Sequence, residues 1–153
     1  MEITPLFEGF FIGLGVYTLS QILSNTFSTT LNKSANEGSE RAYSMEHLEK
    51  MVNEERERMG ISGDTKIEIT LDGEPGCSAI CKHKDYYKLN ITSEEAERMT
   101  IRHELFHLKD NHLGRKFTKI NFVNSFINDL FYTLYAEPKT AIYCLRSKKE
   151  GKF

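Results

Sequence analysis

Residues 92–111, TSEEAERMTIRHELFHLKDN, carry the pattern on which the expected fold depends. Thr92 and Glu95 are spaced as in a capping box, in which a hydroxyl and a carboxylate satisfy the free N–H groups that begin a helix. A helix that begins there would run to about Asn111, and Gly114 would end it. The sequence therefore predicts one helix around the residues that carry the chemistry.

The predicted helix contains the motif HELFH at residues 103–107. His103 and His107 are four residues apart, so both side chains lie on one helix face and can bind one metal ion. Glu104 lies one position further round the helix, at an angle that suits a general base better than a metal ligand. The motif predicts a zinc ion that acidifies a water molecule, while Glu104 takes the proton and passes it to the leaving amine. The alternative is a solvated helix face with two surface histidines.

A zinc site of this kind needs a third protein ligand. One candidate is His112, which lies off the face of the two motif histidines and reaches the ion only if the helix ends first. The other is Glu137, thirty residues after His107 and next to Pro138, where a kink or a new helix is expected. We favour Glu137, because a glutamate from a second packed helix is a common third ligand. The alternative is a carboxylate that only stabilises the start of the helix that follows.

The rest of the sequence predicts an α+β fold. Ser44 and Gly60 bracket an amphipathic helix, whose apolar residues we assign to core packing rather than to a methionine-lined binding surface. A later helix is expected over about 118–146, interrupted at Pro138. Three short strands are expected to form a small antiparallel sheet, and they fall at residues 66–71, 77–81 and 86–91.

The N-terminal segment has a different composition. Residues 9–32 contain no Asp, Glu, Lys or Arg, and an apolar run covers residues 6–23. That length falls between a buried helix and a membrane-spanning helix, which needs about 20 apolar residues. We expect either a helix packed on the domain's own surface or membrane association through this run, with the following positive charges on the cytoplasmic side. Residues 24–39 are expected to be a linker.

The overall composition narrows the class of protein. The chain has 153 residues, 39% hydrophobic and 27% charged, and the net charge of −2 does not favour a nucleic-acid partner. Three cysteines are too few for a disulfide scaffold and favour a reducing compartment. We expect residues 1–40 to form an apolar helix and linker, and residues 41–153 to form one domain, either cytoplasmic or held at a membrane from the cytoplasmic side.

The motif at residues 103–107, followed by Glu137 in a later helix, resembles the gluzincin metallopeptidases. The size of the chain and the order of its expected elements resemble the minigluzincins. These elements are a backing helix at 44–59, a small sheet at 66–91, an active-site helix at 93–111 and a glutamate helix at about 118–146.

The resemblance implies a zincin-like fold and hydrolysis of peptide bonds. It also implies that zinc is bound by His103, His107 and Glu137. An extended peptide substrate would lie along an edge strand, which could be the strand at 86–91 or the one at 77–81.

The resemblance has two gaps. Many gluzincins carry an acidic residue four positions after the ligand glutamate, where it orients a ligand histidine, but Ala141 stands there in this chain. Another partner for the histidine must therefore come from elsewhere. A tyrosine or histidine is also expected to stabilise the oxyanion, and the candidates near Glu137 are Tyr132, Tyr135 and Tyr143.

Two further interpretations are open. Cys77, Cys81, His103 and His107 could form a structural zinc site in a non-catalytic binding module. For the two cysteines, however, we favour small core residues on one strand. The chain could also be an inactive or self-inhibited peptidase fold tethered to a membrane, with its apolar N-terminal segment covering the cleft.

Overall fold

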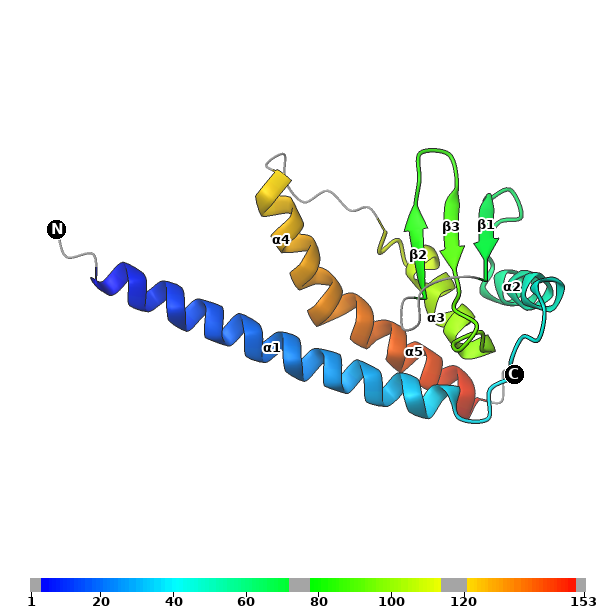
Figure 1. Ribbon diagram of the computed structural model, residues 1–153, viewed down its shortest axis with the longest axis horizontal. Coiled ribbons are helices and arrows are strands. Elements are labelled where there is room, and N and C mark those ends of the chain that lie inside the picture. The colour runs from blue at the N-terminus through cyan, green and yellow to red at the C-terminus, as the bar shows by residue number, and fades with distance from the viewer. Residues whose placement is uncertain (1–3, 72–77, 114–120, 151–153) are drawn as a thin grey trace.

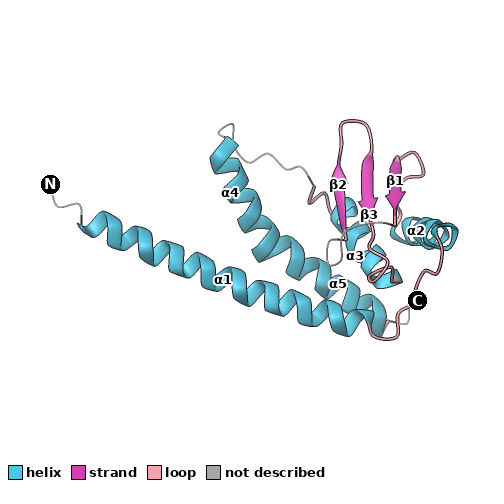
Figure 2. Cartoon of the chain, viewed as in Figure 1, coloured by secondary structure: helices cyan, strands magenta, loops and turns pink. Residues whose placement is uncertain are grey.

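The computed structural model describes residues 4–71, 78–113 and 121–150 and confirms the α+β class (Figure 1; Figure 2). The strands are β1 (Ile67–Thr70), β2 (Ala79–Lys82) and β3 (Tyr87–Asn90). The helices are α1 (Thr4–Asn36), α2 (Met45–Met59), α3 (Arg98–Lys109), α4 (Asn121–Phe131) and α5 (Glu137–Lys149), with a π-helical turn, η1 (Tyr132–Ala136), between the last two.

The three strands form a mixed sheet in the order β1-β3-β2. Strand β2 pairs with β3 in antiparallel fashion, but β1 pairs with β3 in parallel, so the prediction of an antiparallel sheet is wrong for that pair. Strand direction alternates along the chain as in a meander, yet β1 lies beside β3 rather than beside β2. Alternating hydrophobicity identifies a strand but not its neighbour. As a result β3 is central, and β2 is an edge strand that contacts α3.

Helix α2 has the predicted boundaries. Ser44 Oγ accepts a hydrogen bond from the His47 N–H at 3.1 Å. Gly60 ends the helix with a φ of 69°, a left-handed conformation that glycine adopts without strain. The apolar stripe packs into the core as predicted, together with β3 and α3, and its buried members are Leu48, Met51, Val52 and Met59.

Helix α3 begins later than predicted. The expected contact is present, because Thr92 Oγ1 accepts a hydrogen bond from the Glu95 N–H at 3.2 Å, but it closes a turn rather than a helix. The helix begins at Arg98, whose N–H donates to the Glu40 carbonyl at 2.8 Å in a short extended pairing between the two segments. A contact between distant parts of the chain thus overrides the local capping signal.

Helix α1 continues to Asn36, so the predicted linker at residues 24–39 is wrong over most of its length. Ser28 and Ala35 are buried, and Asn36 Nδ2 donates to Thr100 Oγ1 of α3 at 3.2 Å. Figure 1 shows the C-terminal half of α1 running beside α5. Packing against α3 and α5 stabilises residues 24–36, a Ser/Thr-rich segment whose intrinsic helix propensity is modest.

Helix α1 exposes large apolar side chains along its middle, namely Leu14, Val16, Leu19, Ile22, Leu23 and Phe27. Within the part of the chain that the structure describes, no helix has both the length and the apolar character needed to cross a membrane. Membrane association through residues 6–23 stays a prediction.

A buried cluster of ion pairs joins α2 to α3. Glu55 of α2 is fully buried and accepts hydrogen bonds from Arg102 of α3, at 2.7 Å from Nε and 3.0 Å from Nη2. Arg98 reaches the same carboxylate at 3.2 Å and also pairs with Glu54 at 2.7 Å. Charges buried in this way are tolerated only when they are paired. The cluster therefore determines which face of α3 turns toward α2.

Replacing Glu55 with alanine is expected to lower the free energy of unfolding by about 3–5 kcal/mol, because the buried Arg102 guanidinium loses the carboxylate with which it pairs and Arg98 loses one of its acidic partners. Glu54→Ala is the matched control. Glu54 is 41% exposed, so the loss of its pair with Arg98 should cost about 1 kcal/mol or less. Urea denaturation followed by circular dichroism measures both values, and equal losses in the two variants would contradict this account.

Candidate metal centre

Helix α3 places the two motif histidines together on its buried face. His103 and His107 are both buried, and their rings meet edge to face with centroids 4.9 Å apart. The two Nε2 atoms lie 3.1 Å from each other. The prediction that the i, i+4 spacing places both side chains on one helix face is confirmed, and both rings direct the same nitrogen to one point.

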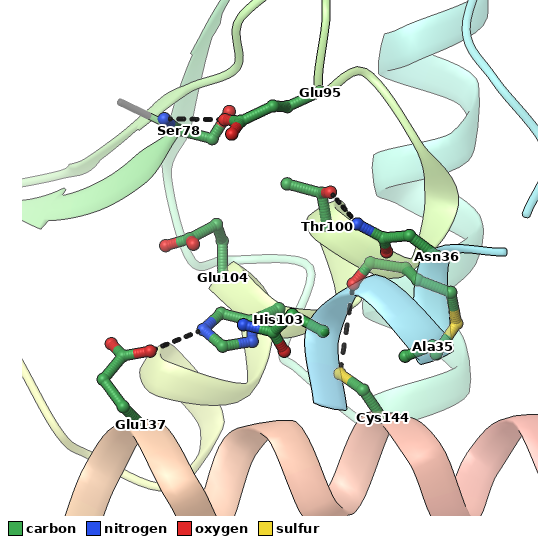
Figure 3. A pocket seen from close by; sticks show the side chains of 11 residues that line it. Ala35, Asn36, Ser78, Glu95, Thr100, His103, Glu104, Glu137 and Cys144 are labelled. Carbon is green, nitrogen blue, oxygen red and sulfur yellow. Dashed lines mark hydrogen bonds and ion pairs between the residues drawn. The ribbon is translucent and has the colours of Figure 1, made fainter. Parts of the chain in front are cut away.

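Glu137 completes the group from the first residue of α5. Its Oε2 lies 3.1 Å from His103 Nε2 (Figure 3). Its Oε1 lies 3.1 Å from His107 Nε2. The π-helical turn η1 precedes it directly, and Pro138, which has no N–H to donate, follows it. The predicted interruption at Pro138 is thus a widened turn in a nearly continuous helix. It delivers the carboxylate to α3.

The three side chains form a group that could hold a metal ion, with their ligand atoms all within 4.8 Å of one another. The donor chemistry fits a cation. Each Nε2 lies close both to the other Nε2 and to a carboxylate oxygen, and one shared proton cannot satisfy all of these contacts at once. A cation at the centre of the three groups would interact favourably with every lone pair.

The environment of Glu137 keeps its carboxylate ionised. Burial acts to raise its pKa, but hydrogen bonds from His103 and His107 outweigh that effect and hold the pKa well below its usual range. An ionised carboxylate is the form that binds a metal ion.

Glu104 lies beside the group but outside it, as predicted. Its Oε2 accepts a hydrogen bond from the Ile80 N–H of edge strand β2 at 2.9 Å. Burial raises the pKa of Glu104 to about 7, and the nearby Glu137 carboxylate adds to the shift, while His107 opposes it. Its carboxyl group can therefore exchange a proton near neutral pH.

A cavity of about 240 Å³ opens next to His103 and Glu104. Figure 3 shows both side chains and Glu137 at its edge, with Asn36 of α1 and Thr100 of α3 on another wall. Ser78, the residue before β2, forms a further boundary, and its N–H donates to Glu95 Oε2 at 3.2 Å. The full lining is Asn32, Ala35, Asn36, Ser78, Glu95, Met99, Thr100, His103, Glu104, Glu137 and Cys144.

His112, the other candidate ligand, does not join the group. Its Nδ1 lies 3.0 Å from His107 Nδ1, the nitrogen that points away from Glu137. On its far side, His112 Nε2 lies 2.6 Å from Asp110 Oδ2. Burial lowers the pKa of His112, and His107 lowers it further, so the ring is neutral at neutral pH.

The three tyrosines near Glu137 differ in their surroundings. The Tyr132 ring lies 5.8 Å from the ring of His107, a member of the His103–His107–Glu137 group, whereas the Tyr135 ring lies 6.0 Å from the His112 ring. Tyr143 stacks on Phe106 at 4.2 Å, and Tyr135 is exposed and accepts a hydrogen bond from Lys139.

The two described cysteines, Cys81 and Cys144, differ in burial. Cys81 is exposed on β2, so its assignment to the core is wrong, because its side chain points to the solvent face of the strand. Cys77 lies outside the described residues, and so does any site that depends on it. Cys144 is buried on α5, and burial raises its pKa to about 12.

Several contacts of the centre could not be read from the sequence. The Ile80 N–H, the Asn36–Thr100 pair and the Asp110–Lys139 pair all depend on how distant segments pack. The one local signal was the spacing between His107 and His112, which indicated that His112 would lie off the ligand face.

Comparison of the chain with protein-family models, with curated proteins and with solved structures finds no match. The case for function therefore rests on the geometry of this centre.

Metal-free protein is expected to lose stability as the pH rises from 4.5 to about 7, because the folded state holds the Glu104 proton more tightly than the unfolded chain does. A shift from 4.5 to about 7 corresponds to about 3 kcal/mol at most. Glu104→Gln removes this dependence. Relative to the wild type, the variant should therefore gain up to that amount between pH 4.5 and pH 8.

Urea denaturation of chelator-treated protein at several pH values measures the difference. Comparing the two proteins cancels the contributions of other groups, including the low pKa of Glu137, whose effect lies below pH 4.5. A difference that stays constant with pH would show that the folded protein does not raise the pKa of Glu104.

Proposed function

We propose that the protein is a zinc-dependent metallopeptidase. The observation that carries this proposal is the convergence of His103, His107 and Glu137 on one point, with Glu104 beside them at the edge of a cavity. Two histidines and a glutamate form a known type of catalytic zinc site, in which a fourth position stays open.

The donor set favours zinc over the other common ions. Calcium and magnesium prefer all-oxygen sites, whereas two imidazole nitrogens and one carboxylate suit zinc. Nitrogen and oxygen ligands about 2.0–2.1 Å from a tetrahedral ion lie about 3.3 Å from one another. The separations of 3.1 Å between the three side chains are close to that value. When bound, zinc supplies acidity to a water molecule and polarises the scissile carbonyl.

Glu104 is proposed as the general base. A carboxyl group with a pKa of about 7 can take a proton from the attacking water and return it to the leaving amine at neutral pH. The hydrogen bond from Ile80 holds its Oε2 toward β2, so the orientation of the carboxylate is coupled to the edge strand. Glu104 thus moves protons while His103, His107 and Glu137 bind the metal.

The substrate is proposed to be an extended peptide lying along β2. Of the two strands considered, β3 is central in the sheet and β2 is an edge strand beside the centre. The N–H groups of Ser78 and Ile80 point away from β3, toward Glu95 and Glu104. Main-chain donors along such an edge are the groups with which an added peptide strand pairs.

The order of elements supports the resemblance to the gluzincins. A helix packed behind the sheet, α2, is followed by the sheet, by α3 with the motif and by α5 with Glu137. This arrangement is consistent with a zincin-like fold, which we include in the proposal.

Glu104→Gln is expected to bind about one zinc per chain, as the wild type does, but to cleave peptides at least about 100-fold more slowly, because the proton acceptor is lost. Elemental analysis gives the stoichiometry, and a fluorogenic peptide library gives the rate. The control is Glu94→Gln, which changes an exposed glutamate four residues before α3 begins and should leave both values unchanged. Cleavage by Glu104→Gln at the wild-type rate would remove Glu104 from the mechanism.

A second candidate is a self-inhibited form of the same peptidase. It is favoured by the position of α1, because Asn32, Ala35 and Asn36 wall the cavity beside the centre. The hydrogen bond from Asn36 to Thr100 fastens this end of α1 to α3. In this form the wild type would bind zinc but cleave slowly.

Asn36→Ala separates the two forms, because it removes the bond to Thr100 and shortens one wall of the cavity. A self-inhibited enzyme should gain about tenfold or more in kcat/KM on short peptides, whereas an open enzyme should not change. Thr30→Ala is the control, since Thr30 is an exposed residue of α1 whose hydroxyl donates to the carbonyl of Thr26. An unchanged kcat/KM in Asn36→Ala would eliminate this candidate.

A further inference from the structure

A chain of polar side chains lies behind His107, on the side away from the proposed metal site. It runs from His107 through His112 and Asp110 to Lys139. The separations are 3.0 Å between the two Nδ1 atoms, 2.6 Å from His112 Nε2 to Asp110 Oδ2, and 2.6 Å from Lys139 Nζ to the same oxygen. The catalytic steps proposed above use none of these last three residues.

The end of α3 makes this chain possible. The helix stops at Lys109, and Asn111 adopts a positive φ of 53°. The His112 N–H then donates to the His107 carbonyl at 2.9 Å, which turns the chain back along the helix. His112 is therefore placed against the outer nitrogen of His107 rather than against the ligand group.

The surroundings of His112 hold its ring in one orientation. The side chain is fully buried, and its ring makes edge-to-face contacts with Phe106 at 6.0 Å and Phe131 at 5.7 Å. Aromatic packing of this kind excludes water from the contact between the two imidazoles. No other polar partner competes for His107 Nδ1 among the hydrogen bonds found in the described residues.

Binding of a metal ion by His107 determines which atom is the donor and which the acceptor at each contact of this chain of side chains. A His107 that presents the lone pair of Nε2 to a metal must carry its proton on Nδ1, so that N–H donates to His112 Nδ1. His112 then carries its own proton on Nε2, which faces the Asp110 carboxylate. Asp110 also accepts a hydrogen bond from Lys139. In this order the His107–His112 and Lys139–Asp110 contacts each join one donor to one acceptor, and His112 Nε2 lies 2.6 Å from Asp110 Oδ2.

We propose that His112 is a positioning residue, and that together with Asp110 it fixes the ring orientation and the tautomer of His107. This inference rests on the proposed metal site. Groups that orient a metal-ligating histidine raise the affinity of the site for its ion. Removing such a group typically lowers the metal affinity 10–100-fold.

The assignment also accounts for a gap in the sequence. Ala141 stands where an acidic residue would orient a ligand histidine, and it is fully buried on α5. In this chain the orienting group comes from the end of α3 instead. His103 contrasts with His107, because its Nδ1 is buried without a hydrogen-bond partner in the described structure.

Two substitutions at His112 test the proposal by metal affinity, measured in competition with a chromophoric zinc chelator. His112→Phe keeps a ring but removes the acceptor, and it should weaken zinc binding about 10–100-fold. His112→Asn can place its Oδ1 near the former Nδ1, and it should stay within about threefold of the wild type. A purely structural role predicts no such rescue, so the urea midpoints of both variants are measured in parallel.

Three further variants make the outcome decisive. Asp110→Ala changes a residue at the protein surface and should weaken zinc binding about tenfold, which carries the test if His112→Phe fails to fold. His83→Phe, at an exposed histidine on the turn between β2 and β3, should have no effect. Glu137→Gln should lose affinity for zinc whether or not His112 and Asp110 orient His107.

Wild-type affinity in both His112→Phe and Asp110→Ala would overturn the proposal while leaving the metal site intact. Equal losses in His112→Phe and His112→Asn would also overturn it. A wild-type chain that binds no zinc would instead overturn the metal site itself, and this inference with it.

Discussion

Helix α3 is buried on several sides at once, although five of its buried side chains are polar or ionisable: Arg98, Arg102, His103, Glu104 and His107. A buried polar group without a partner costs several kcal/mol, so each of these groups requires a partner from another element. The two arginines find it in Glu55 of α2, Glu104 finds it in β2, and the histidines find it in Glu137 of α5. Three neighbouring elements are thus fixed around one helix by the polar residues that it carries.

This constraint explains why structure and function are hard to separate in this chain. The Glu55–Arg102 pair does not line the cavity, yet it sets the rotation of α3 and with it the direction of His103 and His107. The contact from Ile80 to Glu104 joins the sheet to the same helix and orients the carboxylate. Buried polar networks of this kind specify one arrangement of the core, because any other leaves groups unsatisfied.

Local patterns predicted the features that depend on neighbours in the sequence. The Ser44 cap, the Gly60 stop and the common face of His103 and His107 all follow from one or two helical turns. Glu137 was reachable by the same reasoning, because Pro138 marks where the later helix changes.

Features set by distant contacts were not predictable in this way. The pairing of β1 with β3, the late start of α3 and the helical path of residues 24–36 each depend on a partner elsewhere in the chain. The position of His112 depends on where α3 ends. The sequence predicted an end at about Asn111, whereas the helix ends at Lys109. The sequence therefore identified the groups at the centre better than the contacts that orient them.

The two carboxylates of the centre show how one small site can divide two tasks. Burial acts to raise the pKa of both, yet the outcomes are opposite, because Glu137 faces two imidazoles whereas Glu104 faces one backbone N–H. Glu137 stays ionised, as a metal ligand must, while Glu104 titrates near neutrality, as a group that carries protons must. Environments that shift the pKa values of two nearby carboxyl groups in opposite directions are typical of acid–base sites. This divergence supports the roles proposed for the two residues.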